Sequence, residues 1–362
     1  MGIDDITLRL GERRPARAAL SNAVGRFETQ SRVTVDDGWD LDEDLRLLRT
    51  EVARERPRSA LSYNRSPDLP FDRSVNPYRG CEHGCIYCFA RPSHAYLNLS
   101  PGLDFETKLI ARPGIAAVLA RELAAKTYHP AVIALGTNTD PYQPIEATER
   151  LMRQVLEVLA AHNHPVAITT KGTLVERDID ILAPLASKGL CRVGISVTTL
   201  DRDLARKMEP RAPSPERRLQ VIRRLAEAGI PVRVMVAPVV PGLTDSDLEP
   251  ILEAAKAAGA LAASFILLRL PREVSPLWQD WLTTHYPGRA AKVMARLREL
   301  HGGRDYDPAF GKRMRGEGIW ADLLARRFQL AVARLGLNGT MPPLRCDLFA
   351  LPGKPGDQLS LF

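Results

Sequence analysis

The sequence contains few of the residues that mark membrane or secreted proteins. Among its 362 residues are only five cysteines and 6% aromatic residues. It has no apolar run of about 18 residues, the length that a membrane-spanning helix needs. Residues 1–6 lack the basic stretch and the following apolar stretch of a secretion signal. Five cysteines, three of them clustered, make a poor disulfide framework and fit a reducing compartment. We therefore expect a cytoplasmic protein with no membrane segment.

Composition indicates an ordinary globular protein with an uneven distribution of charge. Forty-five per cent of the residues are hydrophobic, and the length suits one large α/β domain or at most two domains. The net charge is +7, and residues 289–334 hold eleven Lys and Arg against five Asp and Glu. This stretch is either a set of solvated helix faces or a basic surface that attracts a phosphate backbone.

Three of the five cysteines lie within eight residues of one another. Cys81, Cys85 and Cys88 have the spacing Cys-x3-Cys-x2-Cys. Three thiolates can hold a four-iron cluster and leave one iron open to bind and split a substrate, unlike the saturated clusters of ferredoxins. A structural zinc site needs a fourth ligand. The alternative is therefore a zinc knuckle that borrows Cys191 or Cys346, although neither stands in a Cys-x2-Cys pair.

Apolar runs alternate with amphipathic segments through the middle of the chain. The expected strands are 132–135, 166–168, 193–197, 232–237 and 264–268, with a sixth before Cys81, and the helical segments include 148–161, 215–228 and 248–258. Strands that alternate with helices of this length predict βαβ units around a parallel sheet. The sequence therefore predicts roughly six such units over residues 75–275.

The composition also predicts four parts along the chain. We expect a polar N-terminal arm over 1–74 with a short helix around Leu41–Ala53, a barrel over 75–275, a helical C-terminal extension over 276–340 and a flexible tail over 341–362. The extension should contain helices at 288–301 and 316–335. Proline and glycine upstream of the last residues favour an extended tail.

The stretch Asn76–Tyr96, which contains the three cysteines, resembles the radical S-adenosylmethionine (radical SAM) superfamily, in the branch that includes spore photoproduct lyase. The resemblance covers roughly residues 58–335. It implies an α/β fold, a partial (β/α)6 TIM-like barrel. It also implies a [4Fe-4S] cluster on Cys81, Cys85 and Cys88, with SAM on the open iron. One electron, from a donor such as a flavodoxin or ferredoxin, would cleave SAM to methionine and a 5′-deoxyadenosyl radical.

The resemblance further implies which residues hold SAM, because this family binds it with the loops that follow the strands. The candidates are Tyr87, Thr137, Asn138, Thr139, Asp140, Lys171, Ser196, Thr198 and Arg211. The loop 136–146 departs from the family's Gly-Gly-Glu motif, so its four candidates are chosen by position only. That loop could instead cap the next helix, with Glu146 complementing the helix dipole.

The branch indicates DNA as substrate, in repair or damage tolerance, but one departure matters. Spore photoproduct lyase returns a hydrogen atom from a cysteine a few dozen residues beyond its cluster motif. Here no cysteine lies between Phe89 and Leu190, so that step cannot be carried over unchanged. Cys191 could substitute, yet it opens an apolar strand, where a buried inert thiol is the other interpretation. No catalytic residue is assigned.

The last five residues, Gln-Leu-Ser-Leu-Phe, match the consensus peptide that docks bacterial replication and repair proteins onto the β sliding clamp. Leu359, Leu361 and Phe362 would enter apolar pockets, and Gln358 would meet polar groups. The alternative is an apolar tail that folds back onto the barrel.

Three hypotheses follow from the sequence. The leading one is a lyase-like radical SAM enzyme that acts on DNA and is recruited by the sliding clamp. The second is a radical SAM enzyme that modifies a peptide, RNA or metabolite. The third is a non-enzymatic iron–sulfur module that binds DNA, and it predicts no SAM cleavage. A six-unit barrel is more scaffold than such a module needs.

Overall fold

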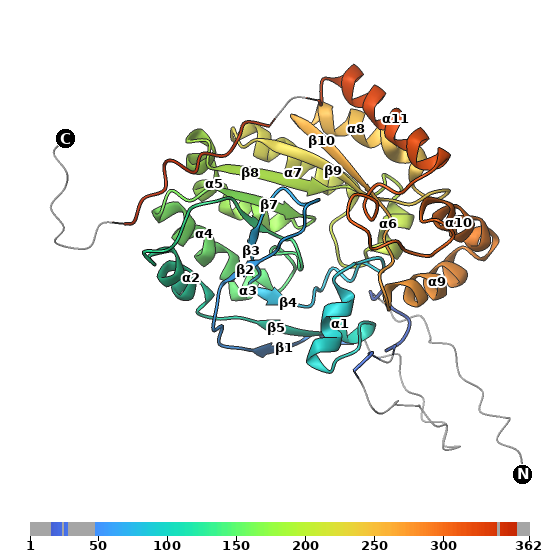
Figure 1. Ribbon diagram of the computed structural model, residues 1–362, viewed down its shortest axis with the longest axis horizontal. Coiled ribbons are helices and arrows are strands. Elements are labelled where there is room, and N and C mark those ends of the chain that lie inside the picture. Colours follow the sequence, from blue (N-terminus) through green and yellow to red (C-terminus); the bar gives the residue numbers. More distant parts are fainter. Residues whose placement is uncertain (1–15, 24, 28–47, 339–340, 353–362) are drawn as a thin grey trace, which may run out of the picture.

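One large sheet organises the fold. The computed structural model describes residues 16–23, 25–27, 48–338 and 341–352. The strands of the sheet are β2 (Leu61–Tyr63), β3 (Arg73–Val75), β6 (Ile133–Leu135), β7 (Val166–Thr170), β8 (Cys191–Ser196), β9 (Val232–Val239) and β10 (Ala262–Leu267). Their order is β10-β9-β8-β7-β6-β3-β2, with β2 antiparallel to β3 and all other neighbours parallel (Figure 1). The six parallel strands confirm the expected α/β fold of an open, partial barrel.

Helices connect the parallel strands and cover the outer face of the sheet (Figure 1). They are α2 (Ile115–Leu123), α3 (Glu146–Glu149), α4 (Leu151–Ala161), α5 (Ile179–Ser187), α6 (Arg202–Met208), α7 (Pro215–Glu227) and α8 (Leu248–Ala257), with the 3-10 turns η2 (Thr173–Asp178) and η3 (Asp245–Asp247). Local signals explain their bounds. The Ser214 hydroxyl caps α7 by accepting from the Arg217 amide, and Gly229 follows its end at φ +74°. None of the described helices is long and apolar enough to cross a membrane.

A smaller sheet forms from a strand that precedes β2 and two strands between β3 and β6. It contains β1 (Glu51–Arg54), β5 (Lys108–Ala111) and β4 (Tyr78–Arg79), in that order, beside η1 (Arg91–Leu97) and α1 (Leu103–Thr107). The helix expected around 41–53 is therefore wrong over 51–53, because β1 pairs in parallel with β5. A partner far along the chain overrides the local preference there. Residues 41–47 lie outside the described residues.

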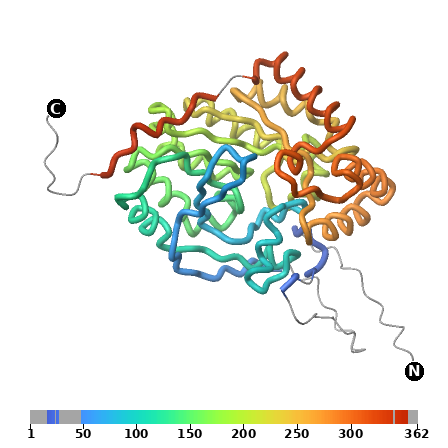
Figure 2. Tube along the Cα trace, in the orientation of Figure 1, coloured from blue at the N-terminus to red at the C-terminus, as the bar shows by residue number. Residues whose placement is uncertain are grey.

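Three helices follow the barrel: α9 (Val274–His285), α10 (Pro287–Leu300) and α11 (Ile319–Leu335). The last two confirm the helices expected at 288–301 and 316–335, whereas the strand–helix pattern did not reveal α9. The ring of Phe328 on α11 packs 4.7 Å from that of Phe265 on β10. Residues 341–352 then run back along the barrel in an extended path, coloured red in Figure 2.

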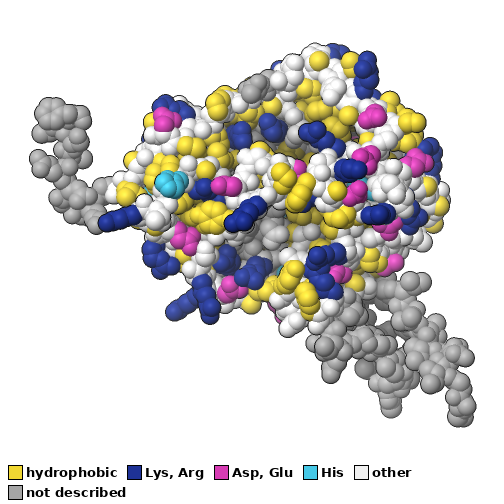
Figure 3. Space-filling model, viewed as in Figure 1, with side chains coloured by type: hydrophobic (Ala, Val, Ile, Leu, Met, Phe, Trp, Pro, Cys, Tyr) yellow, Lys and Arg dark blue, Asp and Glu magenta, His cyan; other side chains and the backbone are white. Residues whose placement is uncertain are grey.

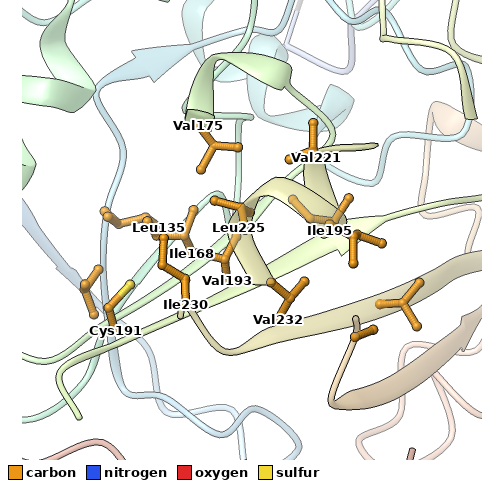
Figure 4. Packing of buried hydrophobic residues seen from close by; sticks show 14 of the residues in the cluster. Leu135, Ile168, Val175, Cys191, Val193, Ile195, Val221, Leu225, Ile230 and Val232 are labelled. Carbon is orange, nitrogen blue, oxygen red and sulfur yellow. The ribbon is translucent and has the colours of Figure 1, made fainter. Parts of the chain in front are cut away.

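The main apolar core lies between the sheet and its outer helices. Val193 and Ile195 of β8 share one buried cluster with Leu225 of α7 (Figure 4). Because side chains alternate along a strand, Gly194 and Ser196 face the opposite side, the interior of the barrel. The outer face of the strands therefore holds the fold together, and the inner face is left for polar residues.

Candidate active site

The cysteine loop follows β4 and lies at the carboxyl ends of the parallel strands. Cys81 and Cys85 are buried, and Cys88 is half-buried. The turn between the first two requires glycine at position 84, where φ is +66°. A Cβ atom on Gly84 would lie 2.7 Å from an oxygen of Glu106. Because there is no side chain at Gly84, the cysteine loop can pack directly against the Glu106 carboxylate.

Arg91 holds the loop from behind. Its guanidinium is completely buried and uses all five N–H donors. Nε donates to the carbonyl oxygen of Cys85 at 2.9 Å, and Nη2 donates to that of Gly84 at 2.9 Å. Nη1 donates to the carbonyl oxygens of residues 101–102, and Nη2 lies 2.5 Å from Oε1 of Glu106. One side chain thus sets the path of the backbone at the second cysteine.

The N-terminal segment contacts the same carboxylate. The backbone amides of Ala18 and Ala19 donate to the two carboxylate oxygens of Glu106 at 3.1 and 3.0 Å. Arg17 donates to the carbonyl oxygen of Glu106 at 2.8 Å. The described part of the arm is therefore held against the back of the cysteine loop.

Gln143 holds the loop on both sides of its first cysteine. Its side-chain oxygen accepts from the amide of Glu82 at 2.8 Å, and its nitrogen donates to the carbonyl oxygen of Gly80 at 3.2 Å. The amide of Cys81 itself donates to the carbonyl oxygen of Phe105 at 3.0 Å. Because Gln143 is fully buried, these bonds are shielded from water.

The other two cysteines lie at the opposite end of the barrel. Cys191 is the first residue of β8 and packs in the apolar core (Figure 4), where burial raises its pKa to about 12. Cys346 follows Arg345, whose amide donates to the carbonyl oxygen of Gly189, just before β8. The cysteine loop is instead at the carboxyl ends of the strands. Neither thiol can reach it, so the zinc-knuckle alternative fails, and Cys191 cannot return a hydrogen atom there.

Asp140 joins the loop after β6 to the end of β7. Its carboxylate accepts from the Thr170 hydroxyl at 2.5 Å and from the amides of Tyr142 and Lys171 at 2.9 and 2.8 Å. Nδ1 of His83 lies 3.3 Å away. Burial acts to raise the pKa of Asp140, but His83, the Lys171 amide and Thr170 together lower it to about 2. The Asp140 carboxylate is therefore ionised, and its oxygens already accept hydrogen bonds from the protein.

The three residues before Asp140 differ in burial and in whether their side chains form hydrogen bonds within the protein. Thr139 is buried and donates to the carbonyl oxygen of Tyr78 at 3.0 Å. Thr137 and Asn138 are half-buried. Within the described residues neither side chain forms a hydrogen bond or ion pair, so both are available to a ligand. Gly136 makes this turn possible, since a Cβ there would lie 1.9 Å from the carbonyl oxygen of Thr169.

A buried carboxylate, Glu209, gathers polar groups beside the second cysteine. The hydroxyls of Tyr87 and Thr198 donate to its Oε1, and Arg218 pairs with its Oε2. Burial acts to raise the pKa of Glu209, but Arg218 and Lys171 outweigh it and lower the pKa to about 2. Tyr87 and Thr198 are thus held in place through an ionised carboxylate.

Lys171 is a cation beside the second cysteine whose ammonium has no hydrogen-bond partner among the described residues. Its ammonium nitrogen lies 5.8 Å from the centre of the Tyr87 ring. Burial acts to lower the pKa of Lys171, but Cys85, when ionised, and the Glu209 carboxylate raise it overall. In the part of the chain that the structure describes, no hydrogen bond to this ammonium is present. It is therefore charged and available to an anionic group.

The chain matches a known family over half its length. A family model described as the Radical SAM superfamily matches residues 75–255. The chain belongs to this superfamily. An uncharacterised protein of Mycobacterium tuberculosis (Rv2578c) is 40% identical over 260 residues, which cover 71% of this chain and 75% of the relative. An uncharacterised protein of Methanocaldococcus jannaschii (MJ0683) is 25% identical over 196 residues, 54% of this chain and 70% of that one.

Solved structures of similar fold include two of spore photoproduct lyase. One is complexed with dinucleoside spore photoproduct and superposes with a TM-score of 0.57 at 16% identity, over 78% of this chain and 79% of that chain. A variant with bound AdoMet and dinucleoside spore photoproduct gives a TM-score of 0.56 at 15% identity, with the same coverage. This likeness shows the fold. The present chain is a radical SAM enzyme, and its cofactors are a [4Fe-4S] cluster and SAM.

The cysteine loop fits the cluster chemically. Burial raises the pKa of Cys81 well above its usual range and that of Cys85 to about 12, so these thiols need bound cations to become thiolates. Among the described residues, no three His, Cys, Asp or Glu side chains converge as they would around a single metal ion. A four-iron cluster does not require this, because each thiolate binds its own iron. Thr137, Asn138 and Lys171 are free to bind SAM, and that they do so stays a prediction.

The remaining SAM candidates also lie near the carboxyl ends of the parallel strands, but their side chains already bind other groups of the protein. Ser196 donates to the carbonyl oxygen of Ala237 at 3.1 Å. Arg211 donates to Glu82, beside the first cysteine, at 3.0 Å. Which of the candidates contact SAM stays a prediction.

The residues that hold the site rigid were missing from the sequence-based prediction. They are Arg91, Glu106, Gln143, Glu209 and Arg218. Each is a charged or amide residue with less than 2% exposure. Arg91 lies three positions after Cys88, and that proximity was the one available signal. A sequence does not show by itself that a charged side chain will be buried.

An aromatic side chain and an arginine stand at the mouth of this site. Phe89, next to Cys88, is 46% exposed. The guanidinium of Arg269, which follows β10, lies 4.4 Å from the centre of the Phe89 ring. Burial lowers the pKa of Arg269, and the nearby Arg313 lowers it further, whereas Tyr306 and Asp68 act to raise it. Phe89 and Arg269 thus form a flat cationic surface beside the third cysteine.

Proposed function

We propose that this radical SAM enzyme acts on DNA, in repair or tolerance of damage. When bound, the cluster and SAM supply a 5′-deoxyadenosyl radical that abstracts hydrogen atoms from carbon. The observation that carries the proposal is the Phe89–Arg269 stack beside Cys88. An exposed aromatic ring backed by a guanidinium is a platform on which nucleobases stack, and this one is next in sequence to the third cysteine.

Exposed cations in the C-terminal extension also support a polyanionic substrate. In the stretch 289–334, six of the eleven cations form ion pairs: Arg296, Arg298, Lys312, Arg313, Arg327 and Arg334. The other five have no ion-pair partner in the described part of the chain, and all are exposed: Arg289, Lys292, Arg304, Arg315 and Arg326. The basic surface is therefore smaller than the sequence implied, but it keeps unpaired charges that could meet phosphates.

The fold similarity to spore photoproduct lyase, which has been solved with a dinucleoside photoproduct, also favours DNA. The chemistry would differ in one respect. Because Cys191 and Cys346 lie at the far end of the barrel, we propose that the hydrogen atom returned to the product does not come from a cysteine other than the cluster ligands.

We also propose recruitment by the bacterial sliding clamp. Its basis is the C-terminal sequence, in which Gln358, Leu359, Leu361 and Phe362 match the clamp-binding consensus. These residues lie outside the described residues, so the proposal depends on sequence alone.

One anaerobic experiment tests the main proposal. The enzyme is reconstituted with iron and sulfide, reduced, and given SAM, and 5′-deoxyadenosine is measured with ultraviolet-damaged DNA, undamaged DNA or no DNA. The control is C85A, which lacks a cluster ligand. We expect deoxyadenosine from the wild type alone and faster formation with damaged DNA. Equal rates with and without either DNA would contradict DNA as substrate. An intact four-iron cluster that forms no deoxyadenosine would instead support the non-enzymatic module.

A further inference from the structure

Two arginines face the interior of the barrel from neighbouring strands. Arg192 and Arg233 are the second residues of β8 and β9. Their neighbours Val193 and Val232 are fully buried in the outer core, so the arginines point the other way. Arg233 pairs in register with Gly194, two residues beyond Arg192 on the same strand face. The two guanidinium groups therefore share one region of the inner wall.

These two cations are not neutralised by the protein. Within the described residues, neither guanidinium forms a hydrogen bond or an ion pair. Burial lowers the pKa of Arg233, and the charge of Arg192 lowers it further, with no carboxylate acting in the other direction. Arg218, by contrast, is buried nearby and pairs with Glu209. Two like charges in a half-buried place are unfavourable unless a ligand compensates them.

The arginines lie on the wall that leads to the radical site. Ser196 is four positions after Arg192 and on the same face of β8, about 13 Å away at strand spacing. Thr198 and the cysteine loop lie beyond. Figure 3 shows Lys and Arg side chains gathered in the hollow of this face, over β8 and β9. A chain that enters the hollow could thus touch the arginines and reach the site.

We propose that Arg192 and Arg233 form an anion subsite inside the barrel that binds a backbone phosphate of the DNA substrate. Guanidinium groups suit this role, because their paired N–H donors match the oxygens of a phosphate. The inference rests on the proposed function, since it assigns the phosphate to DNA. A free phosphate or phosphorylated small molecule has the same chemistry, and the experiment separates these sources.

The test measures binding of a fluorescent single-stranded oligonucleotide by anisotropy over a range of salt concentrations, for reconstituted wild type and R192Q/R233Q. The matched control is R121Q/R223Q, which removes two exposed arginines of α2 and α7 that have no ion-pair partner in the described structure. We expect the double interior variant to bind more weakly and its salt slope to fall by about 0.7, the change for one lost phosphate contact on a single strand. The control should keep its slope. Equal slopes for all three proteins would overturn the subsite and leave DNA as substrate standing.

A second arm uses inorganic phosphate as the probe, with chloride of equal ionic strength as reference. If wild type does not bind DNA, the proposed function fails, and the subsite is judged by this arm alone. Phosphate should then raise the melting temperature of wild type and the control but not of R192Q/R233Q, which would assign the subsite to a small anion. Equal response of all three would overturn it. Without ligand, R192Q/R233Q should melt at the same or a higher temperature than wild type, because it loses like-charge repulsion.

Discussion

Arg91 and Glu106 form a completely buried ion pair, with 2.5 Å between Nη2 and Oε1, directly behind the cysteine loop. The arginine also holds the carbonyl oxygens of Gly84 and Cys85, and the carboxylate holds the amides of Ala18 and Ala19. The geometry of the cluster ligands therefore depends on a charge pair that never contacts the cluster.

Replacing Arg91 should therefore damage both stability and cluster assembly. In R91A the buried carboxylate and four carbonyl oxygens lose their partner, and loss of one member of a buried pair costs about 3–5 kcal/mol. Urea unfolding and iron content after reconstitution measure the two effects. The control is R334A, whose pair with Glu253 is exposed and should contribute at most about 1 kcal/mol. If R91A unfolded like R334A, the Arg91–Glu106 ion pair would be dispensable for stability.

The pKa of Glu209 predicts how stability changes in acid. It is lowered from 4.5 to about 2 in the folded protein, so the unfolded chain takes up the proton first as the pH falls. The stabilisation that the ionised Glu209 contributes is complete above its unfolded pKa of 4.5 and is lost as the pH falls through about 2. The urea midpoint of wild type should therefore drop between about pH 5 and pH 2. E209Q should start lower at pH 7 and lose less over this range, and an equal loss would contradict the assignment.

Lys171 should matter for SAM rather than for folding. Its ammonium has no hydrogen-bond partner in the described structure, so K171M loses only the attraction between Lys171 and Glu209 and should destabilise the protein much less than R91A. A charge-assisted hydrogen bond is worth about 1.5–3 kcal/mol, so SAM affinity should fall roughly tenfold to a hundredfold. Equilibrium dialysis of the reconstituted enzyme with labelled SAM measures this. K188M removes an exposed lysine that bonds only Asn163, and it should keep its affinity.

Phe89 should contribute to DNA binding without being needed for the cluster. Stacking on an aromatic ring is worth about 1–3 kcal/mol per base, so F89A should bind a single-stranded oligonucleotide roughly five to a hundred times more weakly. Its iron content and DNA-independent deoxyadenosine formation should stay near wild type. I319A, which shortens an exposed side chain on α11, is the control. Unchanged oligonucleotide affinity in F89A would remove the stacking platform.

The sliding-clamp proposal predicts that the last five residues are required for binding to the sliding clamp. Immobilised bacterial sliding clamp should retain the full chain and lose a form that lacks residues 358–362. Deoxyadenosine formation in the absence of clamp should be the same for both forms. Equal retention on the clamp would remove the recruitment proposal and leave the enzyme unaffected.

Much of the barrel could be predicted from the sequence, because each strand carries its own signal. The runs at 166–168 and 232–237 are rich in apolar β-branched residues, and the structure places β7 and β9 over them. The segment Glu51–Arg54 has no such signal. It is a strand because β5 lies beside it, and that contact joins parts of the chain that are far apart in sequence.

The sequence by itself determined the chemistry of the centre, because the three cysteines and their spacing lie within eight consecutive residues. Only the tertiary structure decided what the charged residues around it do. Arg91 and Arg218 are buried with carboxylates, whereas Arg192 and Arg233 face the barrel with no carboxylate partner among the described residues. An arginine looks the same in every sequence. Its role depends on which groups the folded chain brings within hydrogen-bonding distance, and those come from strands and loops far along the chain.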